Sequence, residues 1–284
     1  MEIAVLADIH SNYIALERCV EYALDRGIGS FLFLGDYLGE MAYPERTMEL
    51  LRKYNEKYDC VFIKGNKEGY WLQYRDRGEQ GWAEYSSTTG ALYYAYRRLT
   101  EEDMAFFHSL PIARKVQYGD LPELTVCHGS PTNVREIMLS GSQESRKILE
   151  ESESDYILHG HTHIQGKTEH MGKLALNPGS VGLALQAGGL AQFAILHGEG
   201  GCWREEFISL DYDRERVTRE LYESGLYERA PYWCAITEKL LSGEAVDHAG
   251  TLERAMELCR ADTGVCNWPD IPEKYWEQAF AEAK

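Results

Sequence analysis

The 284-residue chain lacks several features that define whole classes of protein. No apolar run approaches the roughly 20 residues that cross a bilayer, so a membrane-spanning protein is not expected. The seven cysteines form no CxxC pair, and their odd number argues against a framework of disulfides. Glu2 leads directly into an apolar strand pattern, without the basic segment of a signal peptide. Together these absences predict a protein of the reducing cytoplasm.

Basic residues are also scarce: 29 Lys and Arg stand against 46 Asp and Glu, and the net charge is −17. Such a charge repels polynucleotides and anionic membranes, so neither is expected as a partner. An acidic protein that handles phosphate groups needs a local cationic centre, and metal ions can supply one. With 44% hydrophobic residues, the chain is long enough for one large domain with an appendage, or for two domains.

The chain does contain an apolar strand pattern that repeatedly runs into a polar loop. The first strands are predicted at 3–7, 31–34 and 60–63, with amphipathic helices at 14–24 and 44–54 between them. Their loops carry Asp8 and His10, then Asp36, then Asn66. Alternating strands and helices indicate a largely parallel sheet, and ligand sites in such sheets collect at the carboxyl ends of the strands.

The remaining sequence adds further strands and two helical regions. Strands are predicted at 112–116, 124–127, 156–158, 173–177, 192–196 and 204–208, with a helix at 143–151. The segment from Tyr70 to His108 is aromatic and helical in tendency. From about Asp211 the pattern changes to three or four helices, with Trp233, Trp268 and Trp276 as apolar anchors.

The stretch from Tyr156 to His163 has the strongest ligand pattern. An apolar run ends at Gly160, and His161 and His163 alternate with Thr162, so both imidazoles can turn toward one side. Neutral imidazole is the commonest metal ligand near neutral pH. A pair of surface histidines explains this stretch equally well on its own, and the upstream loops favour the metal-site interpretation.

Seven strand-end residues have side chains that can bind metal, and none is a thiolate: Asp8, His10, Asp36, Asn66, His128, His161 and His163. Mixed oxygen and nitrogen donors suit Mn, Fe, Zn or Ni better than Ca. Seven donors are too many for one four-coordinate ion but suit two ions that share a carboxylate. Two divalent ions bring +4 and the two aspartates −2, which leaves a centre near +2 that can activate a bridging water and bind a phosphate oxygen.

The order of these residues resembles the calcineurin-like metallophosphoesterase superfamily, and within it the compact prokaryotic phosphodiesterase branch. The matching blocks are Asp8-x-His10, Gly35-Asp36, Gly65-Asn66, His128-Gly129, Gly160-His161-Thr162-His163 and, for the prokaryotic branch, Asn177-Pro178-Gly179-Ser180. The resemblance covers about residues 1–210. It implies that one ion is bound by Asp8, His10 and His163, the other by Asn66, His128 and His161, and that Asp36 bridges the two.

The resemblance also implies an α/β fold, with two packed mixed sheets flanked by helices in four layers over residues 1–210. Residues 211–284, here called the tail, would form a helical extension packed on that domain. With Asp211-Tyr212-Asp213 and Pro231-Tyr232-Trp233, the tail is similar to that of bacterial diadenosine-tetraphosphate hydrolases of the same superfamily.

The implied activity is hydrolysis of phosphodiester or phosphoanhydride bonds by a water that two divalent metal ions activate, with Mn favoured over Fe, Zn and Ni. The expected substrate is a small phosphorylated molecule, in particular a nucleotide such as a dinucleoside polyphosphate. The alternative is a metal-binding scaffold or interaction module with little catalytic activity, as in a eukaryotic trafficking subunit that resembles this fold.

Catalysis is expected to depend on Asp36, Asn66, His128 and Lys67. Many relatives carry a histidine after Gly-Asn that assists the departing alkoxide, whereas this chain has Lys67, followed by Glu68. Because an ammonium group is a poor acid at neutral pH, Lys67 either stabilises phosphoryl charge or has no catalytic role. Substrates with good leaving groups are therefore expected.

Other residues permit two interpretations. Tyr70, Trp71 and Tyr74 lie near one helical face, and a place in the core is favoured over a stacking surface for a nucleobase. Cys127 is expected to turn away from the site, and His159 to have a structural role. The tail is expected to cover the aromatic region beside the metal cleft, either to select the substrate or only to shield the sheet edge.

Overall fold

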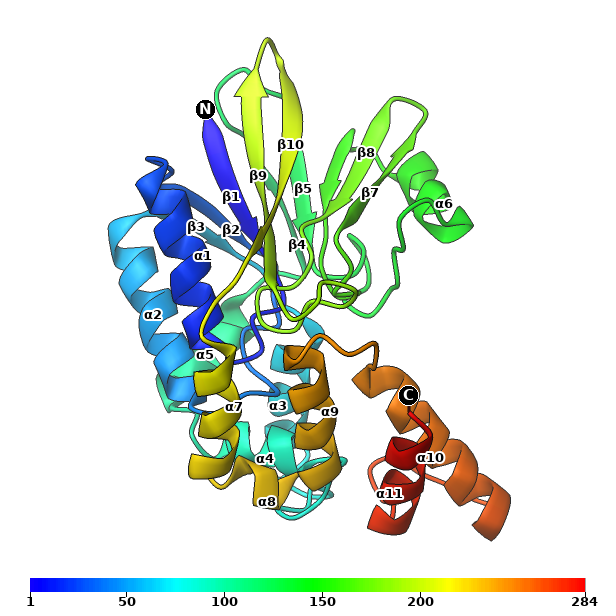
Figure 1. Ribbon diagram of the computed structural model, residues 1–284. Coiled ribbons are helices and arrows are strands. Elements are labelled where there is room, and N and C mark those ends of the chain that lie inside the picture. The colour runs from blue at the N-terminus through cyan, green and yellow to red at the C-terminus, as the bar shows by residue number, and fades with distance from the viewer. Residues whose placement is uncertain (284) are drawn as a thin grey trace.

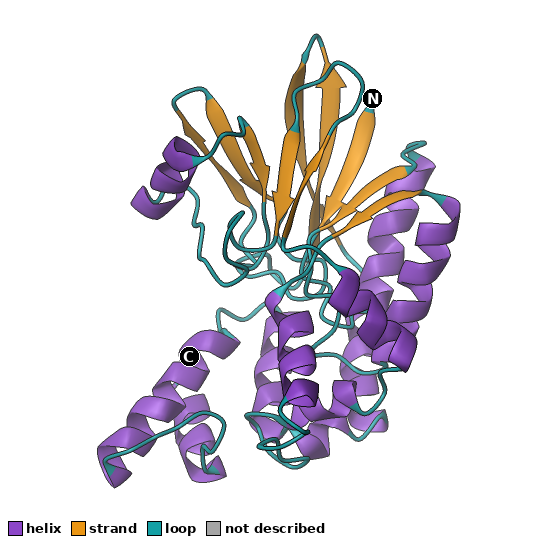
Figure 2. Ribbon diagram, turned by 180° about the vertical axis from the view of Figure 1, so that it is seen from behind, coloured by secondary structure: helices purple, strands orange, loops and turns teal. Residues whose placement is uncertain are grey.

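The computed structural model describes residues 1–283, which form two five-stranded sheets packed face to face, with helices outside them (Figures 1 and 2). The first sheet has the order β10-β9-β1-β2-β3: β1 (Glu2–Leu6), β2 (Ser30–Phe33), β3 (Asp59–Phe62), β9 (Ala191–Glu199) and β10 (Cys202–Leu210). The second has the order β4-β5-β6-β8-β7: β4 (Ala113–Val116), β5 (Leu124–Cys127), β6 (Tyr156–Leu158), β7 (Gly166–His170) and β8 (Lys173–Asn177). Each sheet combines parallel and antiparallel pairs, which confirms the predicted fold class.

Six helices precede the tail. They are α1 (Tyr13–Asp25), α2 (Pro44–Lys57), α3 (Asn66–Asp76), α4 (Gly90–Tyr96), α5 (Glu101–Ser109) and α6 (Gln143–Glu151). The side chain of Asn12 accepts a hydrogen bond from the Ala15 N–H at 3.1 Å and caps the N-terminus of α1. Helices α1 and α2 lie on the outer face of the first sheet, and α6 lies on the outer face of the second (Figure 1).

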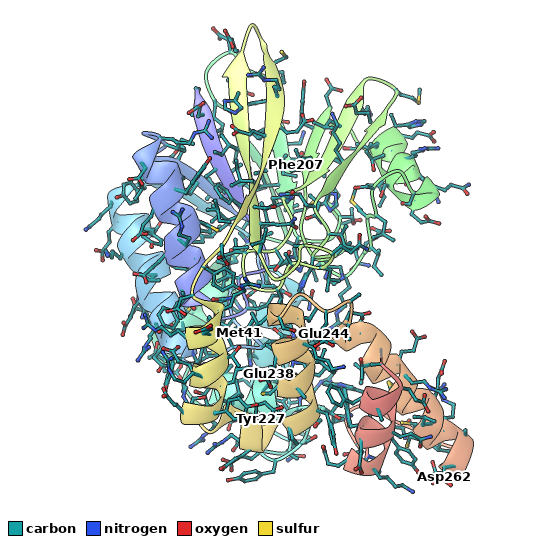
Figure 3. All side chains as sticks on the ribbon, viewed as in Figure 1. Met41, Phe207, Tyr227, Glu238, Glu244 and Asp262 are labelled. Atoms are coloured by element: carbon teal, nitrogen blue, oxygen red, sulfur yellow. The ribbon has the colours of Figure 1, made fainter. Side chains whose placement is uncertain are left out.

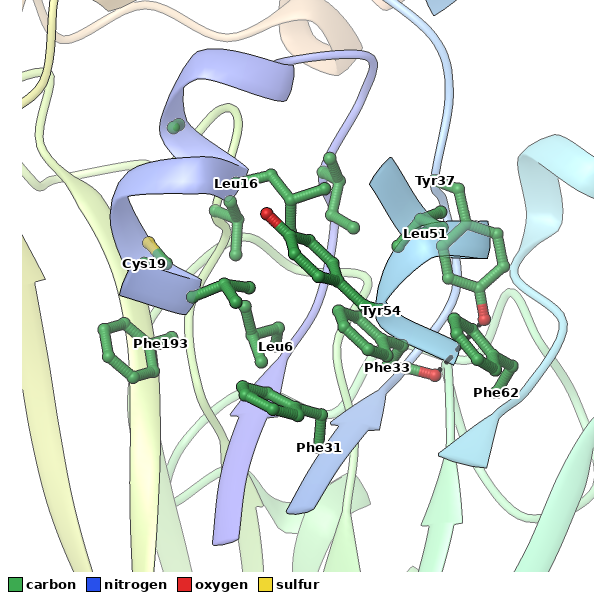
Figure 4. Close-up of a cluster of buried hydrophobic side chains, with 14 of the residues drawn as sticks. Leu6, Leu16, Cys19, Phe31, Phe33, Tyr37, Leu51, Tyr54, Phe62 and Phe193 are labelled. Atoms are coloured by element: carbon green, nitrogen blue, oxygen red, sulfur yellow. Dashed lines mark hydrogen bonds between the residues drawn. The ribbon is translucent and has the colours of Figure 1, made fainter. Parts of the chain in front are cut away.

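The core is layered because successive side chains of a strand point to opposite faces. Ile3 and Val5 of β1 face the second sheet and pack in one cluster with Val126 of β5. Leu6 faces the other way and packs with Leu16 of α1 in the cluster that Figure 4 shows. Burial of each such side chain contributes about 1.5–3 kcal/mol, so the sheets form a firm base for the loops at their ends.

The structure differs from the predicted elements in two places. Strand β7 is not predicted from the sequence, because Gly166–His170 is polar. In the structure this strand pairs with β8 at the edge of the second sheet. The tail has five helices rather than three or four, and α8 is a single turn: α7 (Arg214–Glu223), α8 (Leu226–Arg229), α9 (Pro231–Leu241), α10 (His248–Thr263) and α11 (Glu273–Glu282).

The tail shares a hydrophobic cluster with the rest of the chain. Met41, in the loop after β2, belongs to this cluster together with tail residues such as Leu221 and lies close to α7 and α9 (Figure 3). Trp276 of α11 is fully buried, and its indole N–H donates a hydrogen bond to Thr88 Oγ1 at 2.9 Å. Not every tail aromatic is covered, since Tyr222 is 52% exposed. The division into a domain of residues 1–210 and a helical extension of residues 211–284 packed on it stays a prediction.

None of the helices in residues 1–283 combines the length and the apolar composition that crossing a membrane requires.

If the tail folds as one unit with the sheets, Trp276→Ala should lower the free energy of unfolding by about 3–5 kcal/mol, because it leaves a cavity and an unpaired Thr88 hydroxyl. Denaturant unfolding should show this loss in a single transition. Val265→Ala is the matched tail control, because Val265 is 64% exposed, and should change stability little. A loss confined to a second, separate transition would contradict the shared core.

Candidate metal centre

The loops after β1, β2, β3, β5 and β6 converge at one end of the two sheets, where Figure 1 shows them crowded together above the tail. They bring the seven predicted metal-binding side chains into one cluster. Five of these residues are buried, and His161 and His163 are half-buried at the open side. Polar groups are this deeply buried only when partners compensate them, so the cluster requires a physical explanation.

The backbone of this cluster is strained. Five of the seven residues have left-handed φ angles between 50° and 69°: Asp8, His10, Asp36, His161 and His163. Each such conformation costs of the order of 1–3 kcal/mol and persists only where the surroundings impose it. Gly65 and Gly160 permit the close packing, because a Cβ atom would lie 2.2 Å from Asp36 Oδ1 and 2.7 Å from Asp8 Oδ2, respectively.

Asp8, His10 and His163 form the first group of donors. His10 Nε2 lies 2.9 Å from His163 Nε2, and Asp8 Oδ1 lies 3.8 Å and 3.4 Å from these two nitrogens. Donors that bind one ion at about 2.1 Å lie roughly 3.0–3.4 Å from each other, so this spacing is close to that of a shared ion. The group contains the residues that the family resemblance assigns to one metal.

Asp8, Asp36 and His128 form the second group of donors. His128 Nε2 lies 3.5 Å from Asp36 Oδ1, 3.9 Å from Asp8 Oδ1 and 3.1 Å from Asn66 Oδ1. The ring of His161 stands beside His128, with centroids 5.1 Å apart. The structure therefore brings Asn66, His128 and His161 together, although His161 belongs to neither three-donor group among residues 1–283.

Three imidazoles are held so that Nε2 faces the centre. His128 Nδ1 donates to the Leu34 carbonyl at 2.7 Å, and His163 Nδ1 donates to the Leu183 carbonyl at 2.9 Å. His10 Nδ1 contacts the Glu40 carboxylate. An acceptor behind Nδ1 fixes the tautomer that leaves Nε2 free to bind a metal, which is the arrangement that metal-binding histidines usually show.

The electrostatics of the cluster also fit divalent cations. Asp8 Oδ1 is buried and accepts no hydrogen bond from residues 1–283, although three imidazole nitrogens surround it. Burial opposes a charge on His10, but Glu40 and the two aspartates outweigh it and raise the pKa of His10 to about 10. Burial likewise opposes a charge on His128, yet Asp36 and Asp8 raise its pKa to about 9. The carboxylates thus create a negative potential that metal ions would neutralise.

Lys67, which stands where many relatives carry a histidine, is held by a neighbouring carboxylate. Its ammonium group forms an ion pair with Glu40, which also contacts His10, and lies 5.6 Å from the centroid of the Trp233 ring. Burial favours the neutral amine, but Glu40 and Asp36 outweigh burial and raise the pKa of Lys67. Lys67 therefore keeps its charge and is engaged with Glu40.

Glu40 and Glu68 were not singled out from the sequence. Glu68 is fully buried, and its carboxylate accepts hydrogen bonds from the N–H groups of Asp36, Tyr37 and Gly65 at 3.1, 2.9 and 2.8 Å. It therefore joins the loops after β2 and β3. The sequence offers one signal for Glu40: it is the single acidic residue within the otherwise apolar run Tyr37–Ala42. A carboxylate that is buried in such a run needs a partner.

The other residues for which the sequence allows either a structural or a functional role are placed as structural residues, with one exception. Cys127 packs beneath α6 in a cluster with Leu149, and His159 is buried against β8. In the turn after β8, the Ser180 hydroxyl donates to the Asp8 carbonyl at 2.7 Å, so this segment shapes the site from behind. Trp71 and Tyr74 are buried in or against the core, as favoured. Tyr70 is an exception only in part, because it packs half-buried against the core and also lines a small hollow.

The centre opens into a cleft of about 420 Å³ that the tail helps to build. Tail residues on its wall are Trp233, Leu240, Asp247, His248, Ala249 and Leu252. Ile137 and Leu139, from the loop between β5 and α6, line the opposite side and are 58% and 43% exposed. Tail residues thus stand in the wall of the cleft, whereas the part of the tail in substrate selection stays a prediction.

If Glu40 orients His10, Glu40→Gln should weaken metal binding about 10- to 100-fold, because the amide no longer fixes the His10 tautomer by charge. Isothermal titration calorimetry of the metal-free protein with Mn²⁺ measures this affinity. Glu56→Gln, at an exposed position of α2, is the matched control and should bind metal like the parent protein. Equal affinities for all three proteins would show that Glu40 has no part in the centre.

Comparisons with known proteins agree with this geometry. A sequence model of the calcineurin-like phosphoesterase superfamily domain matches residues 1–201. An uncharacterized protein of Methanocaldococcus jannaschii is 26% identical in an alignment 260 residues long, which covers 85% of this chain and 98% of that protein. None of these comparisons bears on the tail's predicted similarity to diadenosine-tetraphosphate hydrolases, which stays a prediction.

Two solved structures share the fold. A hypothetical protein from Pyrococcus horikoshii OT3 is similar with a TM-score of 0.70 and 22% identity, over 86% of this chain and 99% of its own. A metallophosphoesterase from Sphaerobacter thermophilus is similar with a TM-score of 0.66 and 22% identity, over 84% of this chain and 100% of its own. Since the family match spans well over half of the sequence, the chain belongs to the calcineurin-like phosphoesterase superfamily.

Proposed function

We propose that the protein is a metal-dependent phosphoesterase that uses two divalent ions to hydrolyse phosphodiester or phosphoanhydride bonds. The family implies divalent metals, and one observation supports a pair of them. Asp36 presents Oδ2 toward His10 Nε2 at 3.8 Å and Oδ1 toward His128 Nε2 at 3.5 Å. One carboxylate thus faces both donor groups, which is the position that a bridging ligand requires.

The proposed chemistry divides between the ions and the chain. Bound divalent ions would lower the pKa of a water molecule and neutralise charge on the phosphoryl group. Asp8, His10 and His163 would hold one ion, and Asn66, His128 and His161 the other. The acceptors behind Nδ1 of His10, His128 and His163 keep each Nε2 directed inward. The chain's own contribution is therefore orientation and charge balance.

Lys67 gives this site a preference among leaving groups. Its ammonium group is paired with Glu40 and its pKa is raised, so it is a weak proton donor for a departing alkoxide. It can offer positive charge at the mouth of the cleft. Phosphoanhydrides, aryl esters and nucleotide diesters are accordingly better substrates than alkyl monoesters, and manganese is the proposed metal.

A metal-binding scaffold is the competing proposal, and only the replacement of the family histidine by Lys67 favours it. Hydrolysis of bis(p-nitrophenyl) phosphate by the purified protein separates the two. Turnover should require added Mn²⁺ and should stop when a chelator removes the metal. Saturation of the protein with Mn²⁺ without any turnover would favour the scaffold.

Asp36→Ala should abolish hydrolysis and empty both sites, because a shared carboxylate contributes bonds to two ions. Metal counting on the purified variant by mass spectrometry gives the number of ions per chain directly. Asp59→Ala, at an exposed position of β3, is a matched control that should retain both ions. Two ions per chain in the Asp36 variant would exclude the bridging role.

Lys67→His should improve turnover of substrates with poor leaving groups and change activated aryl diesters little, because only a poor leaving group needs a proton in the transition state. Loss of the ammonium group also unpairs Glu40, so Lys67→Met serves as the reference that lacks both charge and acid. A leaving-group series measured on the His and Met variants gives the comparison. A constant ratio across the series would show that residue 67 does not protonate the leaving group.

A further inference from the structure

A groove leads from the metal centre to a second pocket. The metal cleft and a small hollow of about 120 Å³ share Glu40, Asn66, Lys67, Trp233 and Leu252 as walls. That hollow shares Tyr70, Leu252 and Trp268 with a larger pocket of about 660 Å³. Because neighbouring hollows have wall residues in common, they lie side by side, and together they are here called the groove.

Helix α3 sets the direction of this groove. Its first residue is the predicted ligand Asn66, and Tyr70 follows one turn later, about 6 Å along the helix axis. Gln73 and Arg77, which lies at the C-terminal end of α3, line the large pocket further along. The helix therefore connects the metal centre to the large pocket.

The other walls come from the tail and from the loop after β5. Arg135 lines the large pocket, whereas Ile137 and Leu139 line the metal cleft, so alternate residues of one non-helical segment face the groove. Met138, between them, is buried in the cluster beneath α6. This alternation shows that the segment turns one face to the groove and the other to the core.

The large pocket, here called the aromatic pocket, presents flat rings. Tyr70 and Trp268 stack with their centroids 6.3 Å apart and their planes at 29°. Trp82 is half-buried and lies on Tyr74 at 3.9 Å, in nearly parallel planes. Trp268 is 42% exposed, although large apolar side chains usually lie inside. The exposed part of the Trp268 ring is therefore the surface that can stack on a planar ring, and on a nucleobase in particular.

The aromatic pocket is also cationic in a chain of net charge −17. Arg77 and Arg135 are exposed on its wall, and no acidic residue lines it. Neither guanidinium forms an ion pair with any side chain of residues 1–283, while Arg135 lies 4.8 Å from the Tyr70 ring centroid. An arginine without a carboxylate partner presents its planar donors to a phosphate.

Rings and guanidinium groups together define the chemical class of the ligand. We propose that the aromatic pocket binds the base and an outer phosphate of a mononucleotide or short nucleotide substrate, whose scissile phosphate lies at the metal centre. This inference rests on the proposed phosphoesterase function and adds the substrate class to it. A volume of about 660 Å³ suits one nucleotide unit rather than a polynucleotide, which the net charge also disfavours.

Equilibrium binding tests the aromatic pocket separately from catalysis. Isothermal titration of Mn²⁺-loaded protein should show tighter binding of ADP than of pyrophosphate, both added as their non-hydrolysable methylene-bridged analogues because the proposed activity would cleave the natural anhydrides. Trp268→Ala should weaken ADP about 5- to 100-fold and leave pyrophosphate unchanged, because only the base stacks on the ring. Trp268→Phe should restore most of the ADP affinity. Arg135→Ala should weaken both ligands.

Arg114→Ala is the matched control, because Arg114 is exposed on β4 and lines none of the three hollows, and this variant should bind both ligands like the parent protein. Equal ADP affinity in the Trp268, Arg135 and Arg114 variants, or ADP affinity no greater than that of pyrophosphate, would overturn the proposal. A protein that does not hydrolyse bis(p-nitrophenyl) phosphate but binds ADP through Trp268 and Arg135 supports the aromatic pocket and overturns only the phosphoesterase proposal.

Discussion

Asp8 and Asp36 are buried close to one another, together with the carboxylate of Glu40, and most of this end of the molecule is arranged around their charge. Carboxylates removed from water are stable only with hydrogen bonds or positive charge beside them. Lys67 is the one permanently charged cation that the ion pairs of residues 1–283 place against them. The imidazoles supply the remaining positive charge, either by taking up protons or by binding metal ions together with the carboxylates. The raised pKa values of His10 and His128 have the same cause, namely the buried negative charge beside them.

The two sheets stabilise the crowded loops of the metal centre because they fix the positions at which these loops begin. Five strained backbone positions would relax if the loops were free, since each costs of the order of 1–3 kcal/mol. They are held by interactions that lie outside the predicted ligand set. Glu68 ties the loop after β2 to the loop after β3, and Ser180 ties the turn after β8 to the carbonyl of Asp8. The geometry of the centre is thus imposed from behind by buried polar groups.

The sequence was sufficient for the fold class and for the residues that gather at the centre. Continuous apolar runs that lead into Asp8, Asp36 and Asn66 are local signals, and a shared sheet edge brings these residues together. Glu40 and the aromatic pocket could not be found in this way, because their roles depend on contacts between segments that are far apart in the sequence. Trp268 stacks on Tyr70 across about 200 residues of chain, and no local pattern records that contact. The edge strand β7 was missed for the related reason that its polar sequence faces water.

The place of the tail follows from the same long-range packing. Its aromatic residues meet two requirements at once, since Trp276 fills the shared core while Trp233 and Trp268 face the groove. Trp268, in the connection between α10 and α11, lines the same pocket as Arg135 of the loop after β5. The cleft beside the metal centre is likewise walled by α9 and α10 rather than by the sheets alone. In this chain the core that stabilises the tail and the groove that would recognise a substrate are therefore built from the same helices, so a change in the tail's packing should be felt at the metal centre.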